Sequence, residues 1–232
     1  MKKHGKKYVE ASKNIEAGKL YNAEEAIKLV KNSSTTKFDS TVEVAIKLNI
    51  DAKKSDQSLR GSLILPNGTG KTKKVLVFAK GDNAEKAKAA GADYVGEKDL
   101  IDKIKNESWF DFDVIVASPD MMPEVGKIGM ILGPRGLMPN PKTGTVTPKV
   151  EEAVKNIKSG MVAYKNDSFG NIHTIIGKSS FEEKKLLENL NYVINTIAKA
   201  KPSTVKGIFI NGITISTTMG PGIKIDTNSF DI

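Results

Sequence analysis

Cysteine is absent from this sequence of 232 residues, and histidine occurs only twice, at His4 and His173. Without cysteine the chain can form no disulfide, no thiolate zinc site and no cysteine nucleophile, a composition that suits a reducing cytosol. Two histidines cannot supply a histidine-rich metal site, and they leave little for histidine-based acid–base catalysis. We therefore expect no bound metal and no other cofactor.

Aromatic residues make up only 6% of the chain, which does not favour the stacking of many bases on aromatic platforms. No apolar run reaches the roughly 18 residues of a membrane-spanning helix, so we expect no membrane contact. The basic N-terminus lacks the apolar stretch of a secretory signal. Carboxylates are scattered without a pairing that the sequence can establish, so the machinery of an acid–base enzyme is not visible.

The chain has an excess of basic residues. Lys and Arg number 36 against 27 Asp and Glu, which gives a net charge of +9. Such a balance indicates a polyanion partner, although a basic protein without such a partner is an equal alternative. Residues 1–67 hold 13 basic and 8 acidic side chains, residues 68–158 hold 15 and 13, and residues 159–232 hold 8 and 6. The two end segments thus carry +7 and the middle segment +2.

The stretch Gly68–Thr72 (GTGKT) is similar to the end of a phosphate-binding P-loop. A P-loop needs a further glycine where this chain has Leu65, and it opens a helix. Here the apolar run Val75–Phe78 follows, which predicts a strand, so Gly68–Thr72 is read as a turn. A nucleotide hydrolase and an unselective basic nucleic-acid binder remain as alternative functions that binding assays can separate.

Periodicity predicts the α/β class, with three segments of different character. In the end segments we predict helices over 22–30 and 181–200 and strands over 41–50, 62–66, 171–177, 207–216 and 223–225. In the middle segment we predict strands over 75–78, 92–96 and 113–117, helices over 83–90, 98–106 and 149–158, and an irregular loop over 126–147. Such alternation of strands and helices is typical of a parallel sheet. The basic arm Lys2–Lys7 is expected to be disordered without RNA.

Two turns and one long run stand out as candidate contact surfaces. The run Ile131–Val146 (ILGPRGLMPNPKTGTV) contains glycines and prolines that set particular backbone dihedrals. It is either a rigid loop that ends a sheet or a contact surface, in which Arg135 and Lys142 suit phosphate. Residues 37–41 and 217–221 carry hydroxyls and a glycine, which let a backbone approach RNA closely, although each is also an ordinary turn.

The run 131–146 resembles the signature of the bacterial large-subunit ribosomal protein one family, the proteins of the mobile stalk beside the tRNA exit site. Four further runs match this family in the same order, namely 38–44, 55–61, 91–96 and 217–221. The resemblance extends over essentially the whole chain, and only the tail after Lys224 is unremarkable for the family.

The resemblance implies a fold that periodicity cannot show. Residues 1–67 and 159–232 would join into one split α+β domain that binds RNA, and residues 68–158 would form an inserted Rossmann-like α/β domain on a two-strand hinge. It also implies a structural, non-enzymatic constituent of the large subunit that is cytoplasmic, and monomeric when free. Its partners would be 23S rRNA, exit-site tRNA whose release it assists, its own operon mRNA whose translation it represses, and the rest of the large subunit.

The resemblance also implies contact residues, position by position. The family's RNA-recognition cluster matches Phe38, Thr41, Glu43, Thr217, Thr218, Met219 and Gly220, with Lys37, Lys165 and Asp167 as further contacts. The charge division agrees with this assignment, because the +7 falls on the segments that would hold rRNA.

Overall fold

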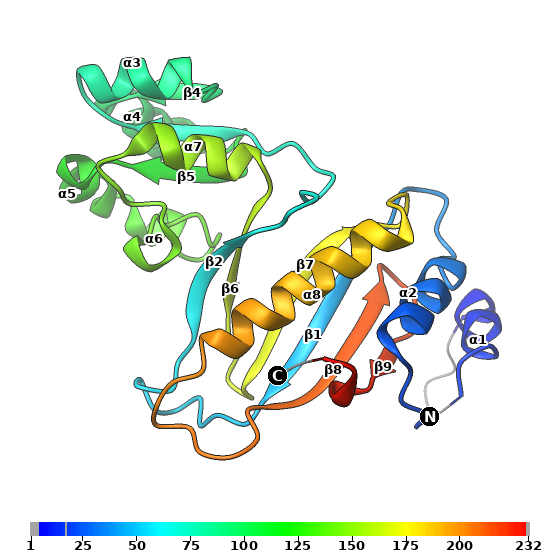
Figure 1. Cartoon of the computed structure of the whole chain (residues 1–232). Coiled ribbons are helices and arrows are strands. Elements are labelled where there is room, and N and C mark those ends of the chain that lie inside the picture. The colour runs from blue at the N-terminus through cyan, green and yellow to red at the C-terminus, as the bar shows by residue number, and fades with distance from the viewer. Residues whose placement is uncertain (1–4, 17, 231–232) are drawn as a thin grey trace. The chain divides into compact units, whose positions relative to one another are not determined.

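The computed structural model describes residues 5–16 and 18–230 of the chain (Figure 1). The chain divides into two compact units, which we call the split unit (Met1–Gly70 with Val162–Ile232) and the insert (Lys71–Met161). It passes from one unit to the other at Gly70–Lys71 and again at Met161–Val162. Both crossings lie just beyond the breaks expected after residues 67 and 158.

The main sheet of the split unit has four strands in the order β7 (Asn171–Lys178), β1 (Thr41–Leu48), β8 (Ile210–Thr217) and β9 (Ile223–Ile225). All three neighbouring pairs are antiparallel. Strand β1, from the first third of the chain, thus lies between two strands from its last third. A separate two-stranded sheet joins β2 (Arg60–Ile64) to β6 (Met161–Lys165).

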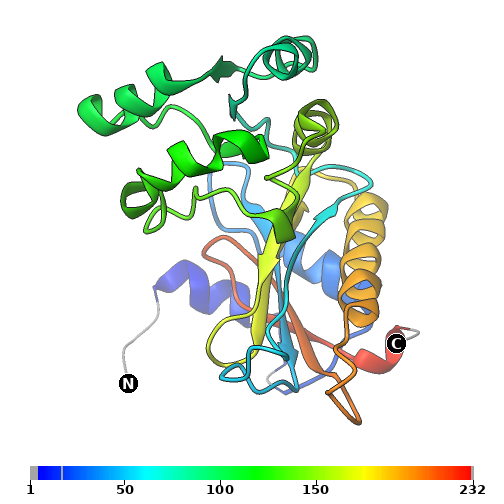
Figure 2. The same ribbon diagram turned by 90° about the vertical axis from the view of Figure 1, so that its left-hand side faces the viewer.

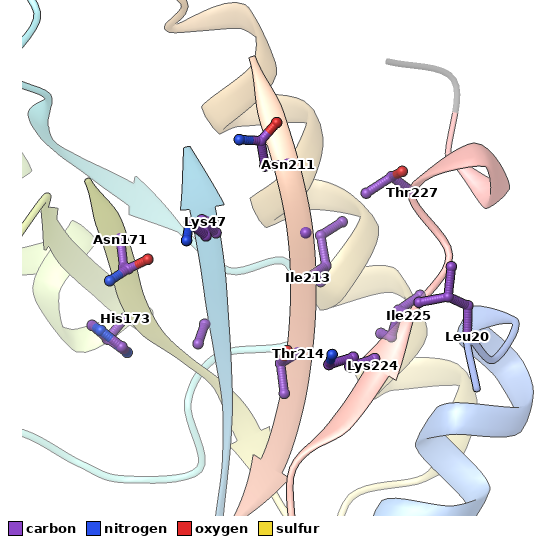
Figure 3. Close-up of a pocket in the computed structure, with 12 residues that line it drawn as sticks. Leu20, Lys47, Asn171, His173, Asn211, Ile213, Thr214, Lys224, Ile225 and Thr227 are labelled. Atoms are coloured by element: carbon purple, nitrogen blue, oxygen red, sulfur yellow. The ribbon is translucent and has the colours of Figure 1, made fainter. Parts of the chain in front are cut away.

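One face of the four-stranded sheet is buried and the other is open. Along β1 the alternate residues Val42, Val44, Ile46 and Leu48 are buried, as a strand with one covered face requires. Helices α2 (Ala23–Asn32) and α8 (Glu183–Lys199) cover this face with apolar stripes (Figures 1 and 2). The intervening residues of each strand point to the open face, where Figure 3 draws some of them as sticks.

The insert is built around a parallel sheet with the order β4 (Tyr94–Gly96), β3 (Val75–Phe78) and β5 (Val114–Ala117). All four residues of β3 are buried, because helices pack on both faces of this sheet. One core includes α3 (Asp82–Ala89) and α7 (Val150–Lys158), and the other includes α4 (Lys98–Glu107), α5 (Met122–Gly126) and α6 (Gly129–Leu132). The prediction of a parallel α/β sheet is confirmed.

Three details differ from the prediction. Strand β6 was not predicted, and the expected loop 126–147 contains α6 and a 3-10 turn at Pro141–Thr143. Lys6 and Lys7 begin a helix, α1 (Lys6–Ser12), so the expected disorder is wrong for them, because the run from Lys6 to Ser12 closes its own backbone hydrogen bonds. Lys2 and Lys3 of the same arm lie outside the described residues.

The GTGKT stretch is irregular backbone with a bend at Gly70, and it leads into β3, as the sequence indicates. No helix opens at Thr72, so the backbone does not form the helix start that holds phosphate in a P-loop. Among the helices that the structure describes, none is long and apolar enough to cross a bilayer.

Candidate RNA interface

Hydrogen bonds join the start of β1 to the turn that follows β8. The backbone N–H of Thr41 donates to the Thr218 hydroxyl oxygen at 3.1 Å, and the N–H of Thr218 donates to the Thr41 carbonyl at 3.0 Å. On the other side of β1, the ammonium of Lys178 donates to the Thr41 hydroxyl at 2.9 Å. These bonds fix the relative position of two segments that lie 177 residues apart in the chain.

The turn Thr217–Gly220 closes with a bond of 2.8 Å from the N–H of Gly220 to the carbonyl of Thr217. Met219 has a φ of +67°, in the left-handed region that residues other than glycine rarely adopt. Its side chain is 76% exposed, so the strained backbone presents an apolar group to solvent. Such strain of about 1–3 kcal/mol persists where the surrounding structure enforces it, and it is concentrated at functional sites.

Gly220 is required by the packing beneath this turn. A Cβ atom at this position would lie 2.3 Å from the hydroxyl oxygen of Thr217. Thr217 itself is buried, and its hydroxyl has no hydrogen-bond partner among the described residues. Thr217 therefore supports the turn from below, whereas Thr218 and Met219 reach the surface.

The loop before β1 carries Lys37 and Phe38, both of them exposed. Asp39 anchors this loop, because its carboxylate accepts bonds of 2.9–3.0 Å from Ser179 and from the backbone and hydroxyl of Ser180. Burial acts to raise the pKa of Asp39, but these hydrogen bonds outweigh it and hold the pKa below its usual value. Phe38, which is 60% exposed, is thus an aromatic ring held on a fixed loop.

The open face of the sheet extends from this junction to the opposite end of the strands. Glu43 lies on it between Ile175 and Ser216, and Lys47 lies further along between Asn171 and Gly212. A depression in this face is shown in Figure 3. Its polar and charged lining residues include Lys47, Asn171, His173, Asn211, Thr214 and Lys224.

Lys165 and Asp167 lie at that opposite end, beside the start of β7. Asp167 accepts hydrogen bonds from the backbone and side chain of Asn171 and from the backbone of Phe169, at 2.8–3.0 Å. These bonds, led by that from the Asn171 backbone, lower the pKa of Asp167 to about 2. Its ring-bearing neighbour Phe169 is 80% exposed.

The structure therefore distributes the expected contact residues over two groups. Thr41, Thr218, Met219 and Gly220 meet at one end of β1, with Lys37 and Phe38 in the loop just before it. Lys165 and Asp167 belong to the other end, roughly 20 Å away at the usual rise of a strand. Glu43 lies on the face between them.

Sequence reasoning did not select several residues of the open face. Lys47 shares the face of Thr41 and Glu43 by the period of two, so the strand pattern alone could have identified it. His173 enters the sequence analysis only as one of the two histidines, and its ring nitrogen lies 3.6 Å from the Asp167 carboxylate. Lys178 and Lys224 join this face only through strand pairings distant in sequence, for which no local signal exists.

The chemistry of this surface is that of a binding site. It combines lysines, hydroxyls and exposed backbone with an aromatic ring and a methionine. Within the described ranges, 5–16 and 18–230, no group of three or more His, Asp or Glu side chains could hold a metal ion. These groups suit the phosphates, 2′-hydroxyls and unpaired bases of folded RNA.

A family model supplies an independent finding. The model of the ribosomal protein L1p/L10e family matches residues 29–221 of this chain, most of its length. The chain belongs to the ribosomal protein L1p/L10e family. Membership of the L1p/L10e family identifies a ribosomal protein of the large subunit that binds rRNA, and the resemblance seen in the sequence is thereby confirmed. The family is one of structural ribosomal proteins and not of enzymes, and its members reside on the ribosome.

Proposed function

We propose that the split unit binds 23S rRNA at the mobile stalk through the surface formed by Lys37, Phe38, Thr41, Glu43, Lys165, Asp167, Thr217, Thr218, Met219 and Gly220. The observation that carries this proposal is the pair of hydrogen bonds between Thr41 and Thr218, which holds the Met219 turn beside the Phe38 loop. A surface fixed before binding loses little conformational entropy when RNA is bound. The open face adds Lys47 and Lys224, whose side chains are exposed to solvent.

The members of the proposed surface have different roles. Phe38 and Met219 supply exposed apolar area against nucleotides, and Thr218 and Gly220 let the backbone approach the RNA closely. Thr217 acts from behind the surface because it is buried, whereas Asp167 shapes the loop beside Lys165 through the hydrogen bonds that it accepts from Phe169 and Asn171. Lys37 and Lys165 are exposed and suit phosphate contacts.

The same surface supports two further roles. A message that folds like the stalk rRNA would compete for it, so the protein would repress translation of its own operon mRNA when rRNA is scarce. We further propose that the protein assists the release of deacylated tRNA from the exit site.

The crossings at Gly70–Lys71 and Met161–Val162 are the proposed hinge for the insert. The free protein is proposed to be a cytoplasmic monomer.

Filter binding with a stalk fragment of 23S rRNA tests the main proposal. Thr218→Val removes the hydroxyl that bonds Thr41 while keeping the shape of the side chain, and it should weaken binding about tenfold. Thr196→Val, on α8 at the covered side of the sheet, is the matched control and should bind like the wild type. Unchanged affinity of a folded Thr218→Val protein would remove this junction from the RNA site.

A further inference from the structure

The run 131–146 lies in the insert and takes no part in the surface described above. It contains the end of α6, where the N–H of Leu137 donates to Leu132 at 3.1 Å and that of Gly136 donates to Gly133 at 3.0 Å. This bonding, with a φ of +70° at Gly136, forms a Schellman motif. The motif rigidly fixes the backbone of Arg135, which comes immediately before Gly136.

The side chain of Arg135 is held on an aromatic ring. Its guanidinium carbon lies 3.7 Å from the centroid of the Phe110 ring, close enough for a cation–π contact. Arg135 is nevertheless exposed, so the ring covers one side of the guanidinium group and solvent reaches the rest. In the part of the chain that the structure describes, no carboxylate lies within 4.0 Å of Arg135 and no acceptor takes its N–H groups.

The ring under Arg135 belongs to a connected aromatic group. Phe110 lies 6.2 Å from Phe112, Phe112 lies 5.4 Å from Trp109, and Trp109 meets Tyr94 edge-on at 4.7 Å. A second cation, the ammonium of Lys103, stands 4.6 Å from the Trp109 ring. Two cations therefore lie on half-buried rings of the same aromatic group, Arg135 on Phe110 and Lys103 on Trp109, and Phe112 connects these two rings.

Arginine is scarce in this chain, which makes its positions informative. Of the 36 basic residues, only Arg60 and Arg135 are arginines, and lysine serves everywhere else. Lysine supplies a compact charge, whereas arginine supplies a flat plane with a fork of donors. The stacked geometry at Arg135 uses that plane, which a lysine would not reproduce.

We propose that Arg135 and Lys103 form a second RNA contact, on the insert, which takes an unpaired nucleotide. The base stacks on the free side of the guanidinium plane, the N–H fork holds a phosphate, and Lys103, on the same aromatic group, adds positive charge for the phosphates of the same strand. RNA is favoured over an acidic peptide because a carboxylate would use the fork but leave the flat face without a partner. This contact goes beyond the function proposed for the split unit and does not depend on it.

Trp109 is the only tryptophan of the chain, so its fluorescence reports on this contact directly. The full chain is titrated with a single-stranded RNA decamer of mixed sequence at constant salt. We expect Trp109 emission to change and saturate, and Arg135→Lys to raise the half-saturating RNA concentration about tenfold. Arg60→Lys, the same substitution at the other arginine, should leave the titration unchanged.

Two further arms make the result decisive. In a Gly220→Ala background, which weakens the split-unit surface, the Trp109 titration should be unaltered, so failure of one proposal does not imply failure of the other. An oligo-glutamate of equal charge should produce no saturating change. Absence of a Trp109 response, an Arg135→Lys midpoint equal to that of the wild type, or an equal response to oligo-glutamate would each overturn the proposal.

Discussion

The split unit and the insert differ in how many faces of their sheets are covered by helices. The insert covers both faces of its parallel sheet with helices, so every residue of β3 is used for packing. The split unit covers one face and leaves the other open, with Glu43, Lys47 and Lys224 projecting from it. An antiparallel sheet can face water on one side, and here that freedom provides an extended polar surface.

The two units also use their lysines differently. In the insert, Lys74 pairs with Asp111 and Lys158 pairs with Asp93, each at 2.6 Å, and Lys127 pairs with Glu124 at 2.8 Å. Across the residues that the structure describes, most of the ion pairs belong to the insert. Such exposed pairs contribute little to stability, but in each pair the carboxylate compensates the charge of the lysine. We therefore expect attraction for RNA to depend on lysines that have no acidic partner, more than on how many lysines a unit holds.

The largest expected effect comes from adding one methyl group to a glycine, and the same substitution is compared in the two units. Gly220→Ala places a Cβ atom 2.3 Å from the Thr217 hydroxyl and must displace the turn, whereas Gly126→Ala meets nothing within 4 Å. We expect Gly220→Ala to weaken binding of the stalk rRNA fragment on the order of 100-fold, since hot-spot residues at the centre of an interface have effects of this size. Gly126→Ala should bind normally. Equal affinities of the two variants in filter binding would contradict the assignment of the site to the split unit.

The next largest effect is expected at Met219, where one substitution should change stability and RNA affinity in opposite directions. Glycine accepts a φ of +67° without strain, so Met219→Gly should raise the free energy of unfolding by about 1 kcal/mol. It also removes the exposed apolar side chain, and we expect RNA affinity to fall about tenfold. Urea denaturation and filter binding measure the two quantities. A variant that is more stable and binds RNA as tightly as the wild type would show that the strained backbone at Met219 does not serve RNA binding.

A smaller effect compares lysines of the two units. Lys47→Gln removes an exposed charge from the open face, and we expect about fivefold weaker binding and a salt dependence of log K that is lower by about one. Lys155→Gln makes the same change at a lysine that pairs with Glu151 in the insert. Its affinity and salt dependence should match the wild type, and a loss equal to that of Lys47→Gln would remove the distinction between paired and unpaired lysines.

The smallest effect is on stability in acid. The folded-state pKa of Asp167, about 2, lies below its ordinary value of 3.8, so its carboxylate stabilises the split unit above pH 4. This contribution is lost as the pH falls from about 4 to about 2, because over that range the unfolded state takes up the proton and the folded state still resists it. Asp167→Asn should lower the thermal midpoint at pH 7 and reduce its change over that window. The Trp109 emission, which reports on the insert, should follow the same acid titration in both proteins.

Much of the fold could be predicted from local patterns. Strand β3 was placed correctly from its apolar run between lysines, and β9 from three residues after a glycine-rich turn. Strand β6 was missed because its MVAYK sequence does not alternate, and because its partner β2 lies about a hundred residues earlier. Helix α6 was missed because the glycines and prolines around it predict a loop.

The site could be predicted only in part, for a similar reason. Resemblance supplied the residues of the proposed surface, but not the fact that Thr217 is buried or that Asp167 accepts hydrogen bonds from Phe169 and Asn171. Nor could it show that the hydroxyl of Thr218 meets the backbone of Thr41. Contacts across such separations depend on strand pairing, which a period of two permits but does not determine.

The position of β1 between β7 and β8 has a consequence for biosynthesis. A nascent chain emerges with β1 early, whereas β8 and the Met219 turn follow only after the whole insert. The insert, complete by Met161, has all of its strands well before that moment. The junction of Thr41 with the Met219 turn therefore forms only after β8 has been synthesised, so the RNA surface proposed for the split unit is completed later than the insert.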